Sequence, residues 1–231
     1  MQIPQLYTKT SYSLLKSTLT IEEYVSAAKE RGYSAIAITD ENVLYGAVEF
    51  FNACKKYQMT GIIGLELDFS FGESIERIVF YGKNVAGYQE LMRLSSTRMM
   101  AEKPLSLADY NIDAKNLISV LPVDNLYDPS EAVFSQIADL INGEFYLGIS
   151  SKTKTSELSE SWPKIALHEV ACLETEQAFA IKIMGHIQNG TQLPREELTN
   201  QLGDNYLMEM GKLIAGFEDK QALANAQHLA E

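Results

Sequence analysis

The sequence predicts an α/β fold built from alternating strands and helices. Short apolar runs such as Ala35–Ile38 are typical of strands that are buried on both faces. A segment with apolar residues at helical spacing then follows, as at Ala47, Phe50, Phe51 and Cys54. Repeated strand-then-helix units predict parallel strands, in a closed barrel or in an open sheet, and periodicity does not choose between these two arrangements.

In the first half of the chain, the expected helices have recognisable start and stop signals. Thr20 and Glu23 form a capping box that opens the first helix, and Gly32 ends it. A later helix is capped by Asn84 and runs to about Met100. The other elements expected here are a helix at 47–57 and strands at 35–38, around 62–67 and at 77–81.

In the second half, the clearest signal is the helix start at Asp128–Glu131, where a proline and a serine follow an aspartate. Gly143 is the expected stop of this helix. The remaining elements are expected as strands at 117–121, 145–149 and 164–167, a helix at 174–189, and further helices beyond Pro194.

Composition indicates one domain of barrel size. The chain has 231 residues, of which 46% are hydrophobic, enough to bury a substantial core. No apolar run approaches the roughly 18 residues of a membrane span, and the N-terminus has no signal-like segment, so we expect a cytoplasmic protein. Cys54 and Cys172 are expected to be core thiols and not a disulfide.

The charge balance argues against nucleic-acid binding. The chain has 19 basic and 31 acidic residues, a net charge of −12. Proteins that grip DNA do so with clustered Lys and Arg, and the nearest such cluster is Lys152–Lys154. We expect no direct nucleic-acid binding by this chain. The acidic surface is interpreted as a source of solubility, with an acidic docking surface as the alternative.

Asp40 and Glu41 follow the strand Ala35–Ile38, at the strand end where chemistry usually lies in α/β folds. The stretch 39–46 reads Thr-Asp-Glu-Asn-Val-Leu-Tyr-Gly. It resembles the second motif of the polymerase-and-histidinol-phosphatase (PHP) domain at the start of bacterial DNA polymerase III alpha subunits. In that family the turn reads Thr-Asp-His-Gly-Asn-Leu-Tyr-Gly. Further matches lie at Tyr12–Leu15, at Ile62–Glu66 and, as the longest one, at Lys83–Ser96.

The resemblance extends over nearly the whole chain and implies a fold and an origin. The implied fold is a distorted seven-stranded β/α (TIM-like) barrel of the PHP type, with its site at the carboxyl ends of the strands. We expect residues 1–231 to form a single PHP domain, as a fragment of a longer polymerase chain. The nucleotidyl-transfer aspartates of the family belong to a palm domain, which would lie beyond Glu231.

The resemblance also implies a site with two or three divalent ions, held by His nitrogens and by Asp or Glu oxygens, that hydrolyses a phosphate ester. In this chain, none of the histidines His168, His186 and His228 falls on a matched ligand position. His168 is expected to be a partly buried histidine satisfied by hydrogen bonds. The vestigial metal-site positions implied by the match are Tyr7, Lys9, Asp40, Glu41, Glu66, Arg77, Glu169, Ala171 and Ile181.

Carboxylates remain at Asp40 and Glu66, with Glu169 in place of an aspartate. Three carboxylates could still hold Mg²⁺ or Mn²⁺ weakly, which stays open as an alternative. However, Lys9 and Arg77 occupy two former ligand positions, and their charges would repel a metal ion. We therefore expect no catalytic residue, no metal and no cofactor. We predict ion pairs between these two cations and some of the carboxylates, with the alternative that both cations point to solvent.

These expectations define the predicted function. We expect a non-catalytic scaffold domain of a bacterial replicative DNA polymerase III alpha subunit, packed against the other domains of the parent polymerase. One alternative is a docking module for a proofreading exonuclease subunit. Another is a residual metal-dependent phosphoesterase or 3′–5′ exonuclease.

Overall fold

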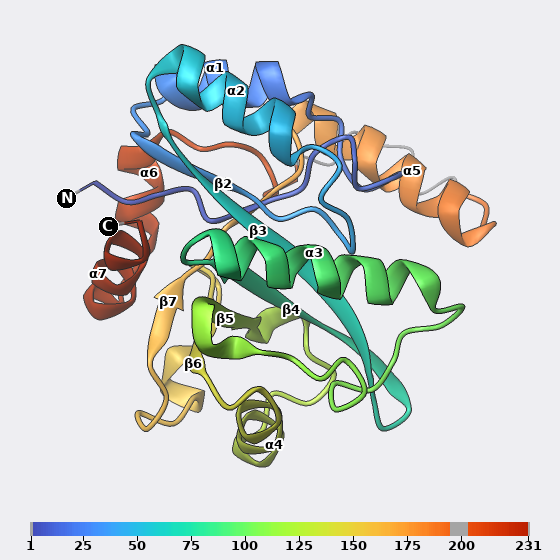
Figure 1. The fold of residues 1–231 in the computed structure, drawn as a ribbon. Coiled ribbons are helices and arrows are strands. Elements are labelled where there is room, and N and C mark those ends of the chain that lie inside the picture. Colours follow the sequence, from blue (N-terminus) through green and yellow to red (C-terminus); the bar gives the residue numbers. More distant parts are fainter. Residues whose placement is uncertain (1, 195–202, 231) are drawn as a thin grey trace.

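The computed structural model describes residues 2–194 and 203–230, which form a mixed α/β fold (Figure 1). Its centre is a curled sheet of six strands in the order β2-β3-β4-β5-β6-β7. The helices lie around the outside of this sheet, with α1 and α2 on one side, α3 across β3 and β4, and α7 against β7. The α/β class predicted from the sequence is confirmed.

The strands of the six-stranded sheet lie where apolar runs predicted them, and several are longer. Their bounds are Ala35–Ile38 (β2), Thr60–Phe71 (β3), Ser74–Gly82 (β4), Leu117–Pro122 (β5), Glu144–Ile149 (β6) and Lys164–Ala166 (β7). Two further short strands, Tyr7–Thr8 (β1) and Glu169–Val170 (β8), pair in parallel as a separate two-stranded sheet. The observed architecture is thus a curled six-stranded sheet with a two-stranded companion.

The expectation that all strands are parallel is wrong for β4. This strand runs antiparallel to β3 and to β5, whereas β2–β3, β5–β6 and β6–β7 are parallel. The physical reason is that no helix connects β3 to β4. Only Gly72 and Glu73 separate the two strands, and Gly72 adopts a φ of +60°, which suits a tight hairpin turn.

The helices begin and end close to the predicted signals. Their bounds are Ile21–Glu30 (α1), Ala47–Tyr57 (α2), Val85–Met100 (α3), Glu131–Ile141 (α4), Ala178–Asn189 (α5), Met210–Gly216 (α6) and Lys220–Leu229 (α7). Four short 3₁₀ turns accompany them, at Ala114–Asn116 (η1), Val123–Asn125 (η2), Thr155–Glu157 (η3) and Thr175–Gln177 (η4). The predicted helix 174–189 is therefore a 3₁₀ turn followed by α5.

Two caps illustrate why the boundaries could be predicted. The side chain of Thr20 accepts a hydrogen bond from Glu23 N, and that of Asn84 accepts one from Gly87 N, as the sequence indicated. The end of α4 differs from the prediction. Asn142, and not Gly143, takes the left-handed conformation that stops the helix, because asparagine also tolerates a positive φ.

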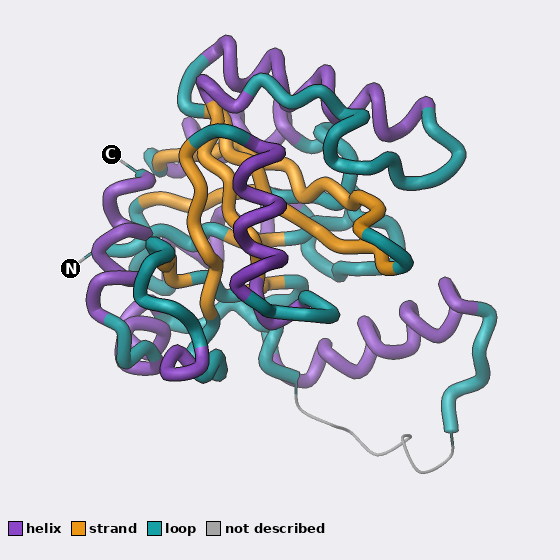
Figure 2. Tube along the Cα trace, turned by 90° about the horizontal axis from the view of Figure 1, so that it is seen from below, coloured by secondary structure: helices purple, strands orange, loops and turns teal. Residues whose placement is uncertain are grey.

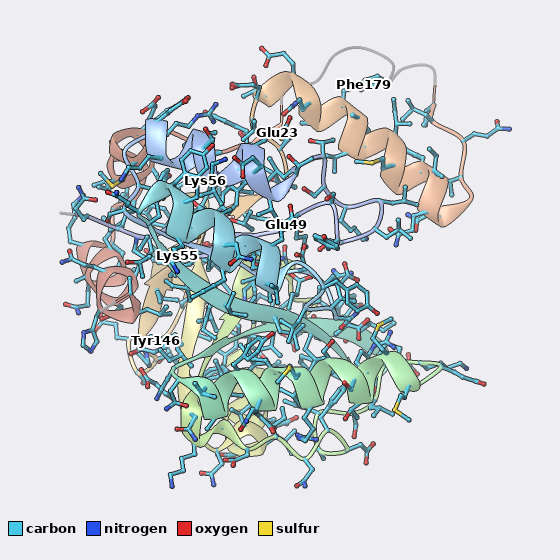
Figure 3. All side chains as sticks on the ribbon, turned by 45° about the horizontal axis from the view of Figure 1, so that its top comes forward. Glu23, Glu49, Lys55, Lys56, Tyr146 and Phe179 are labelled. Atoms are coloured by element: carbon cyan, nitrogen blue, oxygen red, sulfur yellow. The ribbon has the colours of Figure 1, made fainter. Side chains whose placement is uncertain are left out.

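Figure 2 shows α5 extending away from the sheet, ahead of the segment drawn in grey. Figure 3 places Phe179 on this helix, and Glu49, Lys55 and Lys56 on α2. No residue of α5 is fully buried. Cys54 and Cys172 are both buried and free, so the prediction of core thiols is confirmed. No helix in the described ranges is long and apolar enough to span a membrane.

Candidate functional site

The two short strands place Tyr7, Lys9 and Glu169 beside one another. Tyr7 pairs with Glu169 in the register of β1 and β8, and Lys9 N donates to Val170 O at 2.9 Å. Side chains two residues apart on an extended segment point to the same side, so Tyr7 and Lys9 share a face. The local backbone thus directs a phenol and an ammonium toward the same space as a carboxylate.

The strands β2 and β3 bring the remaining carboxylates to this space. Glu41, just past the end of β2, forms a parallel bridge with Glu66 of β3. Glu66 N donates to Asp40 O at 3.1 Å, which fixes the relative position of the two segments. The side chain of Glu66 is 0% exposed. A carboxylate buried this completely requires compensating donors or cations.

Lys9 supplies the first cation. Its Nζ lies 3.2 Å from Glu66 Oε1 and 2.8 Å from Glu169 Oε1. The Lys9 side chain is only 8% exposed, so this contact lies inside the molecule. The predicted ion pairing of Lys9 is confirmed, and the alternative that its head points to solvent is wrong.

Arg77 supplies the second cation, from the antiparallel strand β4. Its Nε lies 3.5 Å from Glu66 Oε1, and its Nη2 lies 3.7 Å from Glu41 Oε1. These distances make ion pairs, but Arg77 Nε and Glu66 Oε1 are both buried without a hydrogen bond of good geometry. The Arg77 side chain is 35% exposed, so its attraction to the carboxylates is partly screened by water.

Tyr7 completes the coordination of Glu66. Its hydroxyl is buried and donates a hydrogen bond to Glu66 Oε2. Burial and the nearby carboxylates of Glu66 and Glu169 raise the pKa of Tyr7 well above its ordinary value, so it remains a donor. The Lys9 ammonium also lies 5.3 Å from the centroid of the Tyr7 ring, within reach of a cation–π attraction.

Asp40 does not take part in the ion pairs. Its carboxylate accepts hydrogen bonds from Thr10 N at 2.7 Å, Thr10 Oγ1 at 2.7 Å and Ser13 Oγ at 2.6 Å. Burial raises its pKa although these donors favour the ionised form. Thr10 and Ser13 stand two and five residues past Thr8, the last residue of β1, and only the folded backbone brings their hydroxyls to Asp40.

Ala171 and Ile181 lie on a cavity of about 280 Å³ that opens beside the ion pairs. Lys9, Arg77 and Glu169 line the same cavity. Five of the nine positions matched from the sequence therefore surround one space. Tyr7, Glu41 and Glu66 join them through the contacts above, and Asp40 is held by its own donors.

Sequence reasoning missed three further polar residues of this cavity, Lys16, Asn125 and Asn205. They come from a loop, from η2 and from the segment before α6, and none lies in a matched motif. Asn125 and Asn205 also border a neighbouring cavity of about 200 Å³. Nothing in their sequence context marks them, because only the tertiary fold brings these three segments together.

The pKa values show which protonation states the cluster favours. Burial alone would lower the pKa of Lys9, but Glu66 and Glu169 attract its charge and raise the pKa above the ordinary value. Burial raises the pKa of Glu66, and the attraction of Lys9 and the hydrogen bond from Tyr7 offset this only in part. Burial is thus the largest influence on the pKa of Glu66, and the positive charges of Lys9 and Arg77 reduce its effect.

The donors available for a metal ion are limited. Within residues 2–194 and 203–230, no three side chains of His, Cys, Asp or Glu are arranged to hold a metal. One carboxylate oxygen of Glu66 and one of Glu169, which lines the cavity, contact Lys9 Nζ. His168 lies to the side, where its Nε2 is 2.9 Å from Tyr206 O, so the prediction of a hydrogen-bonded histidine is confirmed.

A scan of protein families matches residues 5–152 of the chain to the PHP domain. Among curated proteins, the DNA polymerase III subunit alpha of Halalkalibacterium halodurans is 28% identical over 257 residues. The same subunit of Bacillus subtilis is 29% identical over 261 residues. Both matches cover 100% of this chain and 23% of the relative, so the chain spans about a quarter of their length.

Among solved structures, an amidohydrolase from Chromobacterium violaceum with bound sulfate and no metal is similar, with a TM-score of 0.50. The match covers 92% of this chain and 96% of that one, at 14% sequence identity. At this identity the likeness concerns the fold alone.

The buried ion pair makes the stability of the protein depend on Lys9. We expect Lys9→Met to lower the free energy of unfolding by about 3–5 kcal/mol, because it leaves the buried charge of Glu66 without its closest cation. The matched control is Lys56→Met, which removes an exposed partner of Glu22 and should cause no measurable loss. Urea denaturation followed by circular dichroism measures both. Equal effects of the two variants would contradict a buried ion pair.

A second prediction concerns pH. The pKa of Glu66 is raised in the folded state, so the folded protein binds this proton more readily than the unfolded chain. Glu66 therefore contributes stability below its unfolded pKa of about 4.3, which is lost as pH rises through the folded pKa. The stability difference between wild type and Glu66→Gln should fall with rising pH, by at most about 1.4 kcal/mol per unit. A difference that rises between pH 4 and 7 would reverse the assignment.

Proposed function

We propose that this chain, which belongs to the PHP domain family, is a non-catalytic member in which ion pairs have replaced the metal site. It is homologous to the N-terminal domain of DNA polymerase III alpha subunits. In this proposal it acts as a scaffold domain in bacterial DNA replication, inside the cytoplasm, and contributes no hydrolytic chemistry of its own.

One observation supports this proposal above all others: Lys9 Nζ lies between Glu66 and Glu169. A metal-dependent hydrolase needs divalent ions that generate hydroxide and stabilise phosphoryl charge. An ammonium in contact with the same carboxylates neutralises them but does neither. Arg77 adds a second fixed positive charge beside Glu66. The residues present therefore do not fit a divalent metal cluster.

The scaffold role rests on the relatives. Each alpha subunit is about four times as long as the matched segment, so the proposed partners are other domains of a polymerase chain. The fixed network of Lys9, Glu66 and Arg77 joins β1, β3 and β4 without an added ion. A network that needs no metal ion suits a domain with a structural role. Docking of a proofreading exonuclease remains a further proposal that no contact in this chain favours over the scaffold role.

We also propose that the strands close into the seven-stranded barrel expected from the sequence. In support, the segment of β1 is hydrogen-bonded to both sides, since Ala37 N donates to Gln5 O at 2.7 Å and Lys9 N donates to Val170 O. Only two residues separate β7 from β8, so both could belong to one bent strand. If β7 and β8 are counted as one strand, this seventh strand pairs with β6 through β7 and with β1 through β8.

The proposal predicts that the purified chain does not depend on a metal. After expression with added Zn²⁺ and Mn²⁺, elemental analysis should find far less than one metal ion per chain. No hydrolysis of nitrophenyl phosphates or of single-stranded DNA ends should occur in either metal, because imidazole ligands are lacking. Turnover that rises with Mn²⁺ and vanishes in Glu66→Ala would overturn the proposal.

A scaffold with a net charge of −12 should also bind DNA poorly. We expect a Kd no tighter than roughly 10⁻⁴ M at physiological salt for single-stranded or duplex DNA, the weak end of non-specific binding. Fluorescence anisotropy measures it. The control variant Lys152→Gln with Lys154→Gln should make little difference. A micromolar Kd that weakens with salt would reveal a basic surface created by folding.

A further inference from the structure

A groove is lined by the β3–β4 hairpin and by the segment that leads into α4. Glu76 lines it, and its neighbour Arg77 points to the other face of β4 because side chains alternate along a strand. The backbones of the hairpin and of α4 can be followed in Figure 1. Its volume is about 610 Å³, compared with about 280 Å³ for the cavity beside the ion pairs. Phe71, Glu73 and Glu76 line it from the hairpin, and Tyr127, Asp128 and Val133 line it from the other side. None of these residues belongs to the ion-paired cluster.

The hairpin side of the groove combines a packed aromatic pair with polar side chains. Phe71 is opposite Ser74 and Phe69 is opposite Glu76 in the antiparallel register, so these four side chains share one face of the hairpin. The rings of Phe69 and Phe71 meet edge to face, with centroids 6.4 Å apart. Tyr127 stands at the rim with 89% of its surface exposed, although nothing in the fold requires an aromatic ring there.

The groove also contains three carboxylates and no Lys or Arg. Glu76 is only 4% exposed, and the hydroxyl of Ser74 donates a hydrogen bond to its Oε1 at 2.6 Å. Asp128 accepts from Ser130 Oγ at 3.2 Å, and Glu73 is exposed. Across residues 2–194 and 203–230, none of the three is in an ion pair. Glu76 lines the groove with one hydroxyl donor, so a cation brought by a ligand would form a charge-assisted hydrogen bond there.

We propose that this groove binds a positively charged peptide segment of a partner protein, which places an apolar side chain against Phe71 and Tyr127 and a Lys or Arg beside Glu76. Charge complementarity selects this occupant: the rim is acidic, and the whole chain has a net charge of −12, so an acidic or neutral apolar segment gains less there. Tyr127 and Phe71 supply the apolar anchor pocket that short recognition segments use.

The proposal does not depend on whether the ion-paired cluster is catalytically inactive. The groove shares no residue with the cavity beside Lys9 and Arg77. The experiment on the groove can therefore fail while the scaffold proposal stands, and the reverse is equally true.

The test uses the intact chain and a fluorescein-labelled peptide in which lysines alternate with leucine and phenylalanine. Anisotropy at physiological salt should give a Kd on the order of 10⁻⁵ M, as for a weak, transient contact. The double variant Glu73→Gln with Asp128→Asn should weaken binding about tenfold, because it removes two rim charges. Tyr127→Ser should weaken it to a similar extent, and this exposed position should tolerate the change without loss of folding.

Two controls separate the groove from the general acidity of the protein. Glu160→Gln with Glu176→Gln removes two exposed charges elsewhere and should leave the Kd unchanged. A peptide of lysines alone, without apolar residues, should bind at least several-fold more weakly than the amphipathic peptide. Circular dichroism of each variant verifies that it is folded.

Three outcomes would overturn the proposal. The first is no binding of the amphipathic peptide up to millimolar concentration. The second is equal weakening by the groove variant and by its charge-matched control, which would mean non-specific attraction. The third is a concentration-dependent dimer, seen by sedimentation and lost in Tyr127→Ser, which would assign the groove to a second copy of this chain.

Discussion

The complete burial of the Glu66 carboxylate is the constraint on which the rest of the cluster depends. A carboxylate without exposure is stable only if neighbouring groups replace its hydration. Here Tyr7 donates to one oxygen, and Lys9 and Arg77 approach the other. Because these three residues come from β1, its continuation and β4, the need to satisfy one side chain of β3 ties four segments of backbone together. Glu169, on β8, shares Lys9 and extends the same network.

An internal ammonium differs physically from a bound divalent ion in ways that matter for function. It supplies one charge instead of two, it cannot exchange, and it has no open coordination position for water or substrate. Its attraction to Glu66 and Glu169 raises its pKa, so it remains charged across the physiological range. Two carboxylates of the cluster, Glu66 and Glu169, are therefore held together by a charge that belongs to the chain itself.

Local patterns predicted the elements well because caps and apolar spacing act within a few residues, as at Thr20 and Asn84. The antiparallel direction of β4 was missed because a strand has the same period in both directions, and only the short Gly72 turn reveals it. The ion pairs of Lys9 and Arg77 could be predicted, since both cations fall on matched ligand positions of the PHP family, next to carboxylates that remain. The separate bonding of Asp40 by Thr10 and Ser13 could not, because short hydroxyls reach it only through the folded backbone.

The chain thus holds two groups of carboxylates with opposite electrostatic situations. Around Glu66 the neutralising cations are residues of the chain itself, and the group is closed by Tyr7 and the surrounding strands. Around Glu76 the fold provides a hydroxyl and aromatic rings but no cation. The two carboxylates thus differ in whether the chain itself supplies a cation within reach. Cations that belong to the chain stabilise the folded protein whether or not a partner is bound. A cation supplied by a partner would instead link the hairpin to that partner, which makes the β3–β4 groove the more informative surface for function.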